Sequence, residues 1–293
     1  MNSTIPDMWQ AFIGAESIAS GDLTRGKLRW SSRAIHPGIY LPKDAELTLF
    51  NRTAAAWLHT GRTGIIAGRA AAALHGAKWT RSDDPIELIA KHGRPRPGIK
   101  IRQERIAADE IVEIAGMPVT SPARTAFDLA RHLMRNPAVM RLDALAAATG
   151  VTRSDAMHLF ERYRGARNTR AAQLALALMD AGAQSPKETW LRMVVYDAGL
   201  PKPRTQIRVS DGMFSAFIDL GWDEPKVGLD YEGAHHFSDR GQIVHDIGRY
   251  EMIDRQGWLD LRVVAEHRPR FIESRIRDAF AARNYTPSST SWW

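Results

Sequence analysis

The sequence predicts an α/β protein whose C-terminal part is a mixed sheet flanked by helices. The main observation is the order of apolar patterns after residue 180: helix, three strands, helix, strand and helix. A second observation is that short helical and strand-like stretches alternate through the N-terminal part, with turn residues between them. The 293 residues, 44% of them hydrophobic, allow one large domain or two to three small ones.

Composition limits the functions that the chain can have. It contains no cysteine, which excludes disulfides, thiolate metal sites and cysteine nucleophiles, and is compatible with a reducing cytoplasm. There is no apolar run long enough to span a bilayer and no secretory signal, so we expect a cytoplasmic protein without a membrane partner. The net charge of +7 favours a polyphosphate partner such as DNA, although many basic soluble proteins share this charge.

The first 45 residues predict a small winged helix-turn-helix. Residues 7–19 read as a helix capped by Asp7, and a second helix follows with Thr24 as its N-cap. The stretch HPGIYLP then predicts a turn and a short strand. The second helical segment is basic, and its candidate DNA-binding residues are Arg25, Lys27, Arg29 and Arg33. A basic solvated helix on a scaffold domain is an equally good interpretation.

The central part predicts an α+β region at residues 46–150 and a helical linker at 151–180. Two helices are expected between residues 45 and 75, the second reading IIAGRAAAALHGAKW and ending at Gly76. Strands are expected at 85–90 and 98–106, and a pair of strands around Gly116 is expected at 111–121. Ser121 then caps a helix with Pro122 in its first position.

The C-terminal domain, expected at residues 181–285, contains a group of acidic residues. Two strand-like runs, Met213–Leu220 and Lys226–Glu232, flank a turn and predict a hairpin. Period-two alternation places Asp230 and Glu232 on one face, and Asp219 can lie beside them across the hairpin. Clustered carboxylates suit Mg²⁺ or Mn²⁺. Acids at strand ends are also common on solvated faces that hold no metal.

The elements around this hairpin are also marked in the sequence. Ser185, Pro186 and Glu188 form a capping box at the start of a helix, which gives Glu188 a structural task. A helix from about Asp239 to Gln256 carries Gln242, Asp246 and Arg249 on one strip. WLDLRVV then reads as a strand, and PRFIESRIRDAF reads as an amphipathic helix.

The blocks SPKETWLR, FIDLGWDEPKVGLDYEGAHH, HDIGRYEMIDRQGW and LRVV resemble very-short-patch-repair endonucleases of the PD-(D/E)XK superfamily, over roughly residues 180–283. The resemblance implies a Mg²⁺- or Mn²⁺-dependent endonuclease acting on DNA. It assigns catalytic roles to Glu188, Asp219, Asp230, Glu232 and His236, and metal binding to Asp219, Asp230 and Glu232. The chain departs from the pattern, because it reads Asp-Tyr-Glu where relatives read Glu-x-Asp and lacks the usual lysine.

The N-terminal stretches GDLTRGKLR, HPGIYLP, AGRAAAALHGAKW and GMPVTSPARTAFDLA are similar to AbiEi-type antitoxin domains of actinobacteria and their phages. This resemblance implies a toxin–antitoxin or phage-defence context with a toxin or phage partner, and a homodimer is one expected assembly. Two functions stay open. One is a metal-dependent DNA endonuclease, favoured by the complete set of acids. The other is a catalytically inactive DNA-binding regulator, such as an antitoxin-like repressor, favoured by the altered Asp-Tyr-Glu order.

Overall fold

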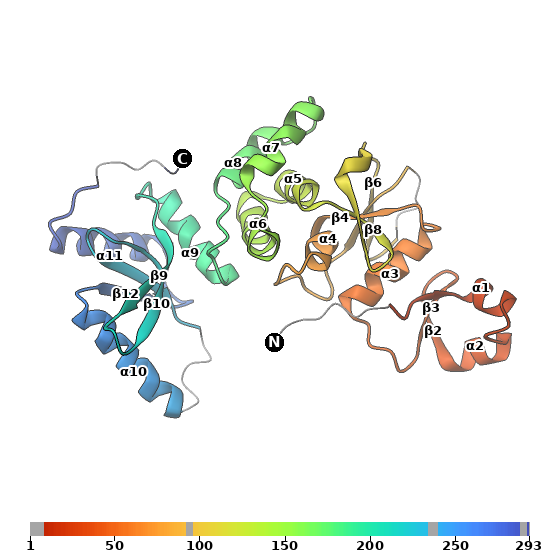
Figure 1. Ribbon diagram of the computed structural model, residues 1–293, viewed down its shortest axis with the longest axis horizontal. Helices are drawn as coiled ribbons and strands as arrows, with labels where there is room; N and C mark the ends of the chain where they lie inside the picture. The colour runs from red at the N-terminus through yellow and green to blue at the C-terminus, as the bar shows by residue number, and fades with distance from the viewer. Residues whose placement is uncertain (1–8, 92–95, 234–239, 288–291, 293) are drawn as a thin grey trace. The chain divides into compact units, whose positions relative to one another are not determined.

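The computed structural model describes residues 9–91, 96–233, 240–287 and 292, without the side chains of 240–246. The chain forms two compact units, Met1–Met179 and Asp180–Trp293. Both units combine helices with β-sheets, so the predicted α/β class is confirmed (Figure 1). Among the described residues, no helix is long and apolar enough to cross a membrane. The finer division into parts ending at residues 45, 150 and 180 stays a prediction.

The N-terminal segment is a three-stranded sheet with two short helices, in the strand order β1-β3-β2. The second helix begins where the sequence predicts, because Thr24 Oγ1 accepts a hydrogen bond from the Lys27 N–H at 3.2 Å. Leu28 is the buried residue of this helix. The elements of the segment are β1 (Phe12–Ile13), α1 (Gly14–Ala19), α2 (Arg25–Ser31), β2 (Ser32–His36) and β3 (Ile39–Pro42).

The predicted helix over residues 7–19 is wrong at Phe12 and Ile13. These two residues pair with Tyr40 and Ile39 as a strand, and the helix starts only at Gly14. A Cβ at position 14 would lie 2.6 Å from the Tyr40 ring, so glycine lets the chain turn from strand to helix beside that ring. The expected cap, Asp7, lies outside the described residues.

A five-stranded sheet in the order β6-β5-β4-β8-β7 forms the centre of the first unit. One correction concerns Ile65–Ala67, which the sequence analysis placed in a helix. These residues form a strand because Ile66 and its neighbours pair with strands on both sides. The core lies between the sheet and two alanine-rich helices. The elements are α3 (Leu49–His59), β4 (Ile65–Ala67), α4 (Gly68–Leu74), β5 (Ile86–Ile89), β6 (Ile99–Arg102), β7 (Ile111–Ile114) and β8 (Met117–Thr120).

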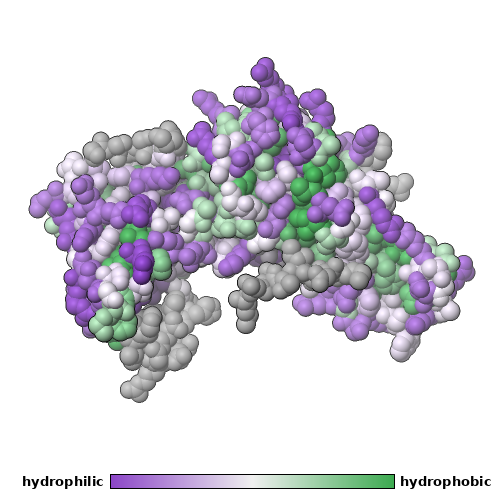
Figure 2. Space-filling view, viewed as in Figure 1, coloured by the Kyte–Doolittle hydropathy of each residue, from purple (hydrophilic) through white to green (hydrophobic). Residues whose placement is uncertain are grey.

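Four further helices complete the first unit. The first begins at the predicted cap, where Ser121 Oγ accepts from the Arg124 N–H at 3.3 Å. Phe127 packs edge-on against Phe160, with ring centroids 4.9 Å apart. The outer side of α7 (Arg153–Arg162) and α8 (Thr169–Ala177) is hydrophilic (Figure 2). These helices are α5 (Pro122–His132), α6 (Arg135–Thr149), α7 (Arg153–Arg162) and α8 (Thr169–Ala177).

The second unit has the predicted order of helix, three strands, helix, strand and helix. Its sheet runs β12-β11-β10-β9, with β10 antiparallel to both neighbours and β12 parallel to β11. The sheet lies between α10 on one side and α9 and α11 on the other (Figure 1). The elements are α9 (Pro186–Asp197), β9 (Arg204–Ser210), β10 (Ser215–Trp222), β11 (Val227–Tyr231), α10 (Arg240–Arg255), β12 (Leu259–Val263) and α11 (Pro269–Ala282).

Candidate functional site

Two carboxylates lie where β10 and β11 part. The antiparallel pairing of these strands ends at Leu220 and Leu229. Beyond that pair, Asp230 Oδ1 accepts from the Asp219 N–H at 2.8 Å, and Asp219 Oδ2 accepts from the Tyr231 N–H at 2.9 Å. Side-chain carboxylates therefore replace backbone carbonyls as acceptors at this point. The structure brings Asp219 and Asp230 together, as the hairpin pattern predicted.

Glu188 approaches the same place from the first turn of α9. Its backbone N–H bonds the Ser185 cap at 3.1 Å, as predicted, and its Oε2 accepts from the Gln184 N–H at 2.8 Å and from Gln206 Nε2 at 3.1 Å. Burial raises the pKa of Glu188, and the nearby charge of Asp230 raises it further. Glu188 thus fixes the start of the helix and also adds a third acidic group to the site.

Among the described residues, Arg249 of α10 is a cation that contacts these acids. It forms an ion pair with Asp230 and donates to the Phe217 carbonyl oxygen at 2.6 Å. Even so, the pKa of Asp219 is raised to about 7, first by burial and then by the charges of Asp230 and Glu188. The guanidinium of Arg249 lowers the pKa of Asp219, but by less than burial and the two neighbouring acids raise it.

Asp260 of β12 is a site residue that the sequence analysis missed. It lies beside Gly228 on the parallel neighbour β11, and both of its carboxylate oxygens are buried without a hydrogen-bond partner. Burial and the charge of Asp230 raise its pKa. A Cβ at Gly228 would lie 3.0 Å from Asp260 Oδ1, so the glycine leaves room for this carboxyl group. An acid inside the apolar run WLDLRVV was the signal available in the sequence.

Glu232 is engaged by other partners. The Tyr250 hydroxyl donates to Glu232 Oε1, and Arg262 Nε lies 3.8 Å from the same oxygen. Its role as a metal ligand stays a prediction, and it would require that Glu232 leave Tyr250. His236, the predicted catalytic histidine, lies outside the described residues, as do the side chains of Gln242 and Asp246.

The donor set of this site, the carboxylate cluster Glu188, Asp219, Asp230 and Asp260, suits a hard divalent cation. Carboxylate oxygens are the ligands that Mg²⁺ and Mn²⁺ prefer. The buried oxygens of Asp260 accept no hydrogen bond, and the charges of Arg249 and Arg262 only partly offset the burial that raises its pKa. The described acids of this cluster do not, however, hold three ligand atoms within 4.8 Å of one another. Protons on the carboxyl groups with raised pKa values are the alternative way to neutralise the cluster.

In the described part of the first unit, three residues do bring one ligand atom each within 4.8 Å of one another. They are Glu104, Asp128 and His132. Two arginines already neutralise it. Arg124 Nε lies 3.0 Å from Asp128, and Arg131 Nη1 lies 3.1 Å from Glu104. Arg124 also pairs with a further buried acid (Glu110, 2.5 Å). A divalent cation would have to compete with both guanidinium groups, so we interpret this cluster as a structural ion network.

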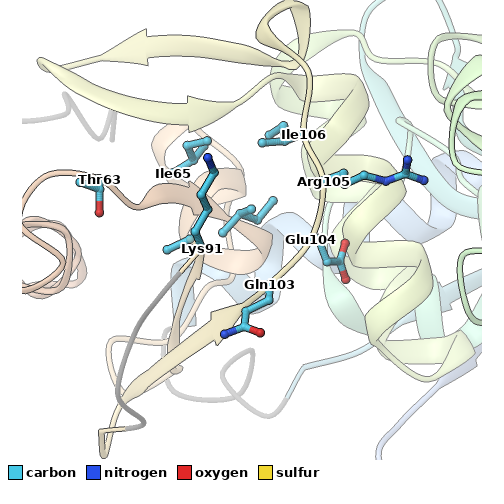
Figure 3. Close-up of a pocket in the computed structure, with 9 residues that line it drawn as sticks. Thr63, Ile65, Lys91, Gln103, Glu104, Arg105 and Ile106 are labelled. Carbon is cyan, nitrogen blue, oxygen red and sulfur yellow. The ribbon is translucent and has the colours of Figure 1, made fainter.

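Beside this network lies a cavity of about 870 Å³. It opens where the parallel strands β5 and β6 end, and Figure 3 shows the Arg105 side chain turned away from Lys91. A volume of this size could hold a small molecule. The residues that line it are Thr63, Ile65, Ile89, Ala90, Lys91, Gln103, Glu104, Arg105 and Ile106.

Three of the four predicted DNA-binding residues lie on α2, and the fourth lies beyond its end. Arg25, Lys27 and Arg29 lie on the helix with exposed side chains. Arg33 is not helical as the sequence suggested, because the chain becomes strand β2 at Ser32. Its guanidinium donates to the Ala45 carbonyl oxygen within the fold. The structure therefore leaves three of the four cations on one exposed helix.

These features define a two-unit α/β protein with a basic helix in one unit and a buried carboxylate cluster in the other. Residues 53–181 match the family described as AbiEi antitoxin C-terminal domain. The match covers the five-stranded sheet and helices α4 to α8. The chain is also similar to two uncharacterized proteins of Mycobacterium tuberculosis, from strains CDC 1551 / Oshkosh and ATCC 25618 / H37Rv. Each is 26% identical over 230 residues, which is 78% of this chain and 84% of the relative.

Proposed function

We propose that the chain is a DNA-binding protein with a cation-dependent phosphodiesterase site, acting in a toxin–antitoxin or phage-defence system. The observation that carries this proposal is the carboxylate cluster, in which four acids from four elements meet where β10 and β11 part. Burying so many acids is unfavourable unless cations or protons neutralise them. The match of residues 53–181 supports the antitoxin-related context.

The arrangement of elements supports a nuclease of the PD-(D/E)XK type. The helix acid Glu188, the hairpin acid Asp219 and the second-strand acid Asp230 lie on α9, β10 and β11, the elements that the resemblance implies. Asp219 and Asp230 would hold Mg²⁺ or Mn²⁺, with Glu188 or Asp260 adding further oxygens. When bound, the cation would supply electrostatic stabilisation of the charge that develops on a phosphodiester.

The other residues of the site have separate tasks in this proposal. Arg249 neutralises Asp230 and carries donors that could also bind a phosphate oxygen. Asp219 has a pKa of about 7, so near neutral pH it can lose its proton and offer a carboxylate to the cation. The bonds from Gln184 and Gln206 orient the carboxylate of Glu188.

Calorimetric titration of Mn²⁺ and Mg²⁺, with plasmid cleavage on the same samples, tests this proposal. The variants are the wild type, Asp219→Asn with Asp230→Asn, and the control Asp223→Asn. Asp223 lies in the turn of the same hairpin, where it pairs with exposed Arg204 at 2.6 Å. We expect cation binding and cleavage in the wild type and the control, and neither in the double variant. Absence of cation binding in the wild type would rule out the phosphodiesterase site.

A DNA-binding regulator without turnover is the second candidate. The observation in its favour is that the acids already have partners within the protein, Asp230 with Arg249 and Glu232 with Tyr250. In this case the wild type binds duplex DNA equally well in EDTA and in Mg²⁺, and it cleaves neither. Cleavage that requires the cation and both aspartates would exclude this candidate.

A further inference from the structure

Helix α2 carries a large aromatic side chain in the solvent. Trp30 is 80% exposed, whereas Trp79 of the same unit is 49% exposed. Leu28 is the buried residue of this helix. With about 100° per residue, Gly26 and Trp30 both lie within about 20° of the direction opposite Leu28. The indole therefore stands at the centre of the outward face.

Positive charges flank the indole on both sides. Lys27 and Arg29 lie about 100° to either side of Leu28, and Arg25 adds a third exposed cation. The first turn of the helix has no acidic residue. At Gly26 an added Cβ would meet only Thr24 Oγ1, at 3.9 Å, so the surface beside the indole is low and open.

This pattern fits duplex DNA. Cations on both sides of an apolar centre, Lys27 on one side and Arg25 and Arg29 on the other, match two phosphate strands on either side of a groove. The major groove admits a helix, and the apolar group that it presents is the methyl group of thymine.

We propose that Trp30 is a specificity-determining residue that contacts thymine methyl groups in the major groove while Lys27 and Arg29 bind phosphates. This inference rests on the proposed DNA binding and takes α2, with its three exposed cations, as the element that binds. The phosphate contacts supply affinity for any sequence, and the indole contact supplies the preference for thymine.

The test compares duplexes that differ only in the thymine methyl. A preferred duplex is first selected from a random library with the wild-type protein. Its affinity is then measured by fluorescence anisotropy, with thymine and with uracil at each position, for the wild type, Trp30→Ala, Lys27→Ala and the control Trp79→Ala.

We expect the wild type and Trp79→Ala to bind the uracil duplex roughly tenfold more weakly at one or more positions. Trp30→Ala should bind thymine and uracil duplexes equally, with an unchanged salt dependence. Lys27→Ala should weaken binding to all duplexes and reduce the salt slope by about one.

The outcomes separate two kinds of failure. If Trp30→Ala keeps the thymine preference, or the wild type never shows one, the role of Trp30 is wrong while DNA binding stands. If the wild type binds no duplex at all, the proposed DNA binding fails and the role of Trp30 fails with it. A melting temperature equal to that of the wild type confirms that Trp30→Ala is folded.

Discussion

The carboxyl group of Asp260 shows what burial does to a single residue. Its pKa is raised above the unfolded value, so the folded protein keeps a proton that the unfolded chain releases. Stability should therefore fall as pH rises from about 4 through neutrality. Asp260→Asn removes the contribution of this residue, while those of Asp219 and Glu188 remain, and the variant should be about 1–3 kcal/mol more stable than the wild type at pH 8. Urea unfolding at pH 5 and pH 8 measures the free energy of unfolding of the wild type, of Asp260→Asn and of the control Asp254→Asn, whose side chain is exposed. If the stability of Asp260→Asn fell between pH 5 and pH 8 by as much as that of the wild type, the pKa of Asp260 would not be the cause.

Asp219 gives a second prediction at the residue scale. Its pKa of about 7 means that a cation must displace a proton below neutral pH. We expect Mn²⁺ affinity to be roughly tenfold lower at pH 6 than at pH 8, and to become less dependent on pH in Asp219→Asn. Calorimetry in two buffers of different ionisation enthalpy also counts the proton released. Equal affinities at both pH values in the wild type would show that Asp219 is not a ligand.

Some residues of the site follow from sequence spacing and some do not. The hairpin places Asp219 next to Asp230 because local pairing and period-two alternation are enough to do so. Asp260 depends on β12 returning parallel to β11, and Arg249 depends on how α10 packs. Neither relation is local, so a pattern within one segment cannot reveal it.

Among the elements, α1 shows how one glycine sets a boundary. Gly14→Ala would put a Cβ 2.6 Å from the Tyr40 ring, so we expect a loss of about 1–3 kcal/mol in stability. Gly26→Ala is the matched control, because its site is open and helical and alanine should stabilise it by about 0.5–1 kcal/mol. Thermal unfolding of both variants measures the difference. Equal stability of the two variants would show that Tyr40 moves freely.

The elements also show which sequence signals are reliable. Caps at Thr24, Ser121 and Ser185 were predicted, because capping chemistry is local. The two-residue strand at Phe12–Ile13 and the strand Ile65–Ala67 were read as helix. Both are too short to show a strand period, and they form only because partner strands lie beside them.

On the scale of the whole molecule, two compact units predict two unfolding transitions. Arg124 is 1% exposed and holds Asp128 and Glu110 in the first unit. Arg124→Met removes a buried cation from both acids, leaving Asp128 with Arg131 at 3.8 Å and Glu110 with Arg162 at 2.6 Å, and should cost about 3 kcal/mol. We expect calorimetry to show the transition of the first unit shifted and that of the second unchanged. The control Arg81→Met removes an exposed pair and should have little effect. A shift of both transitions together would contradict independent units.

The parallel pairing of β11 with β12 has a kinetic consequence. The two strands are joined by a crossover that contains α10, and such long-range pairing forms slowly. We therefore expect Asp260 to join the other acids late, after the local hairpin of β10 and β11 has formed. A cation bound at the finished cluster is expected to slow the unfolding of the second unit and to leave its folding rate almost unchanged.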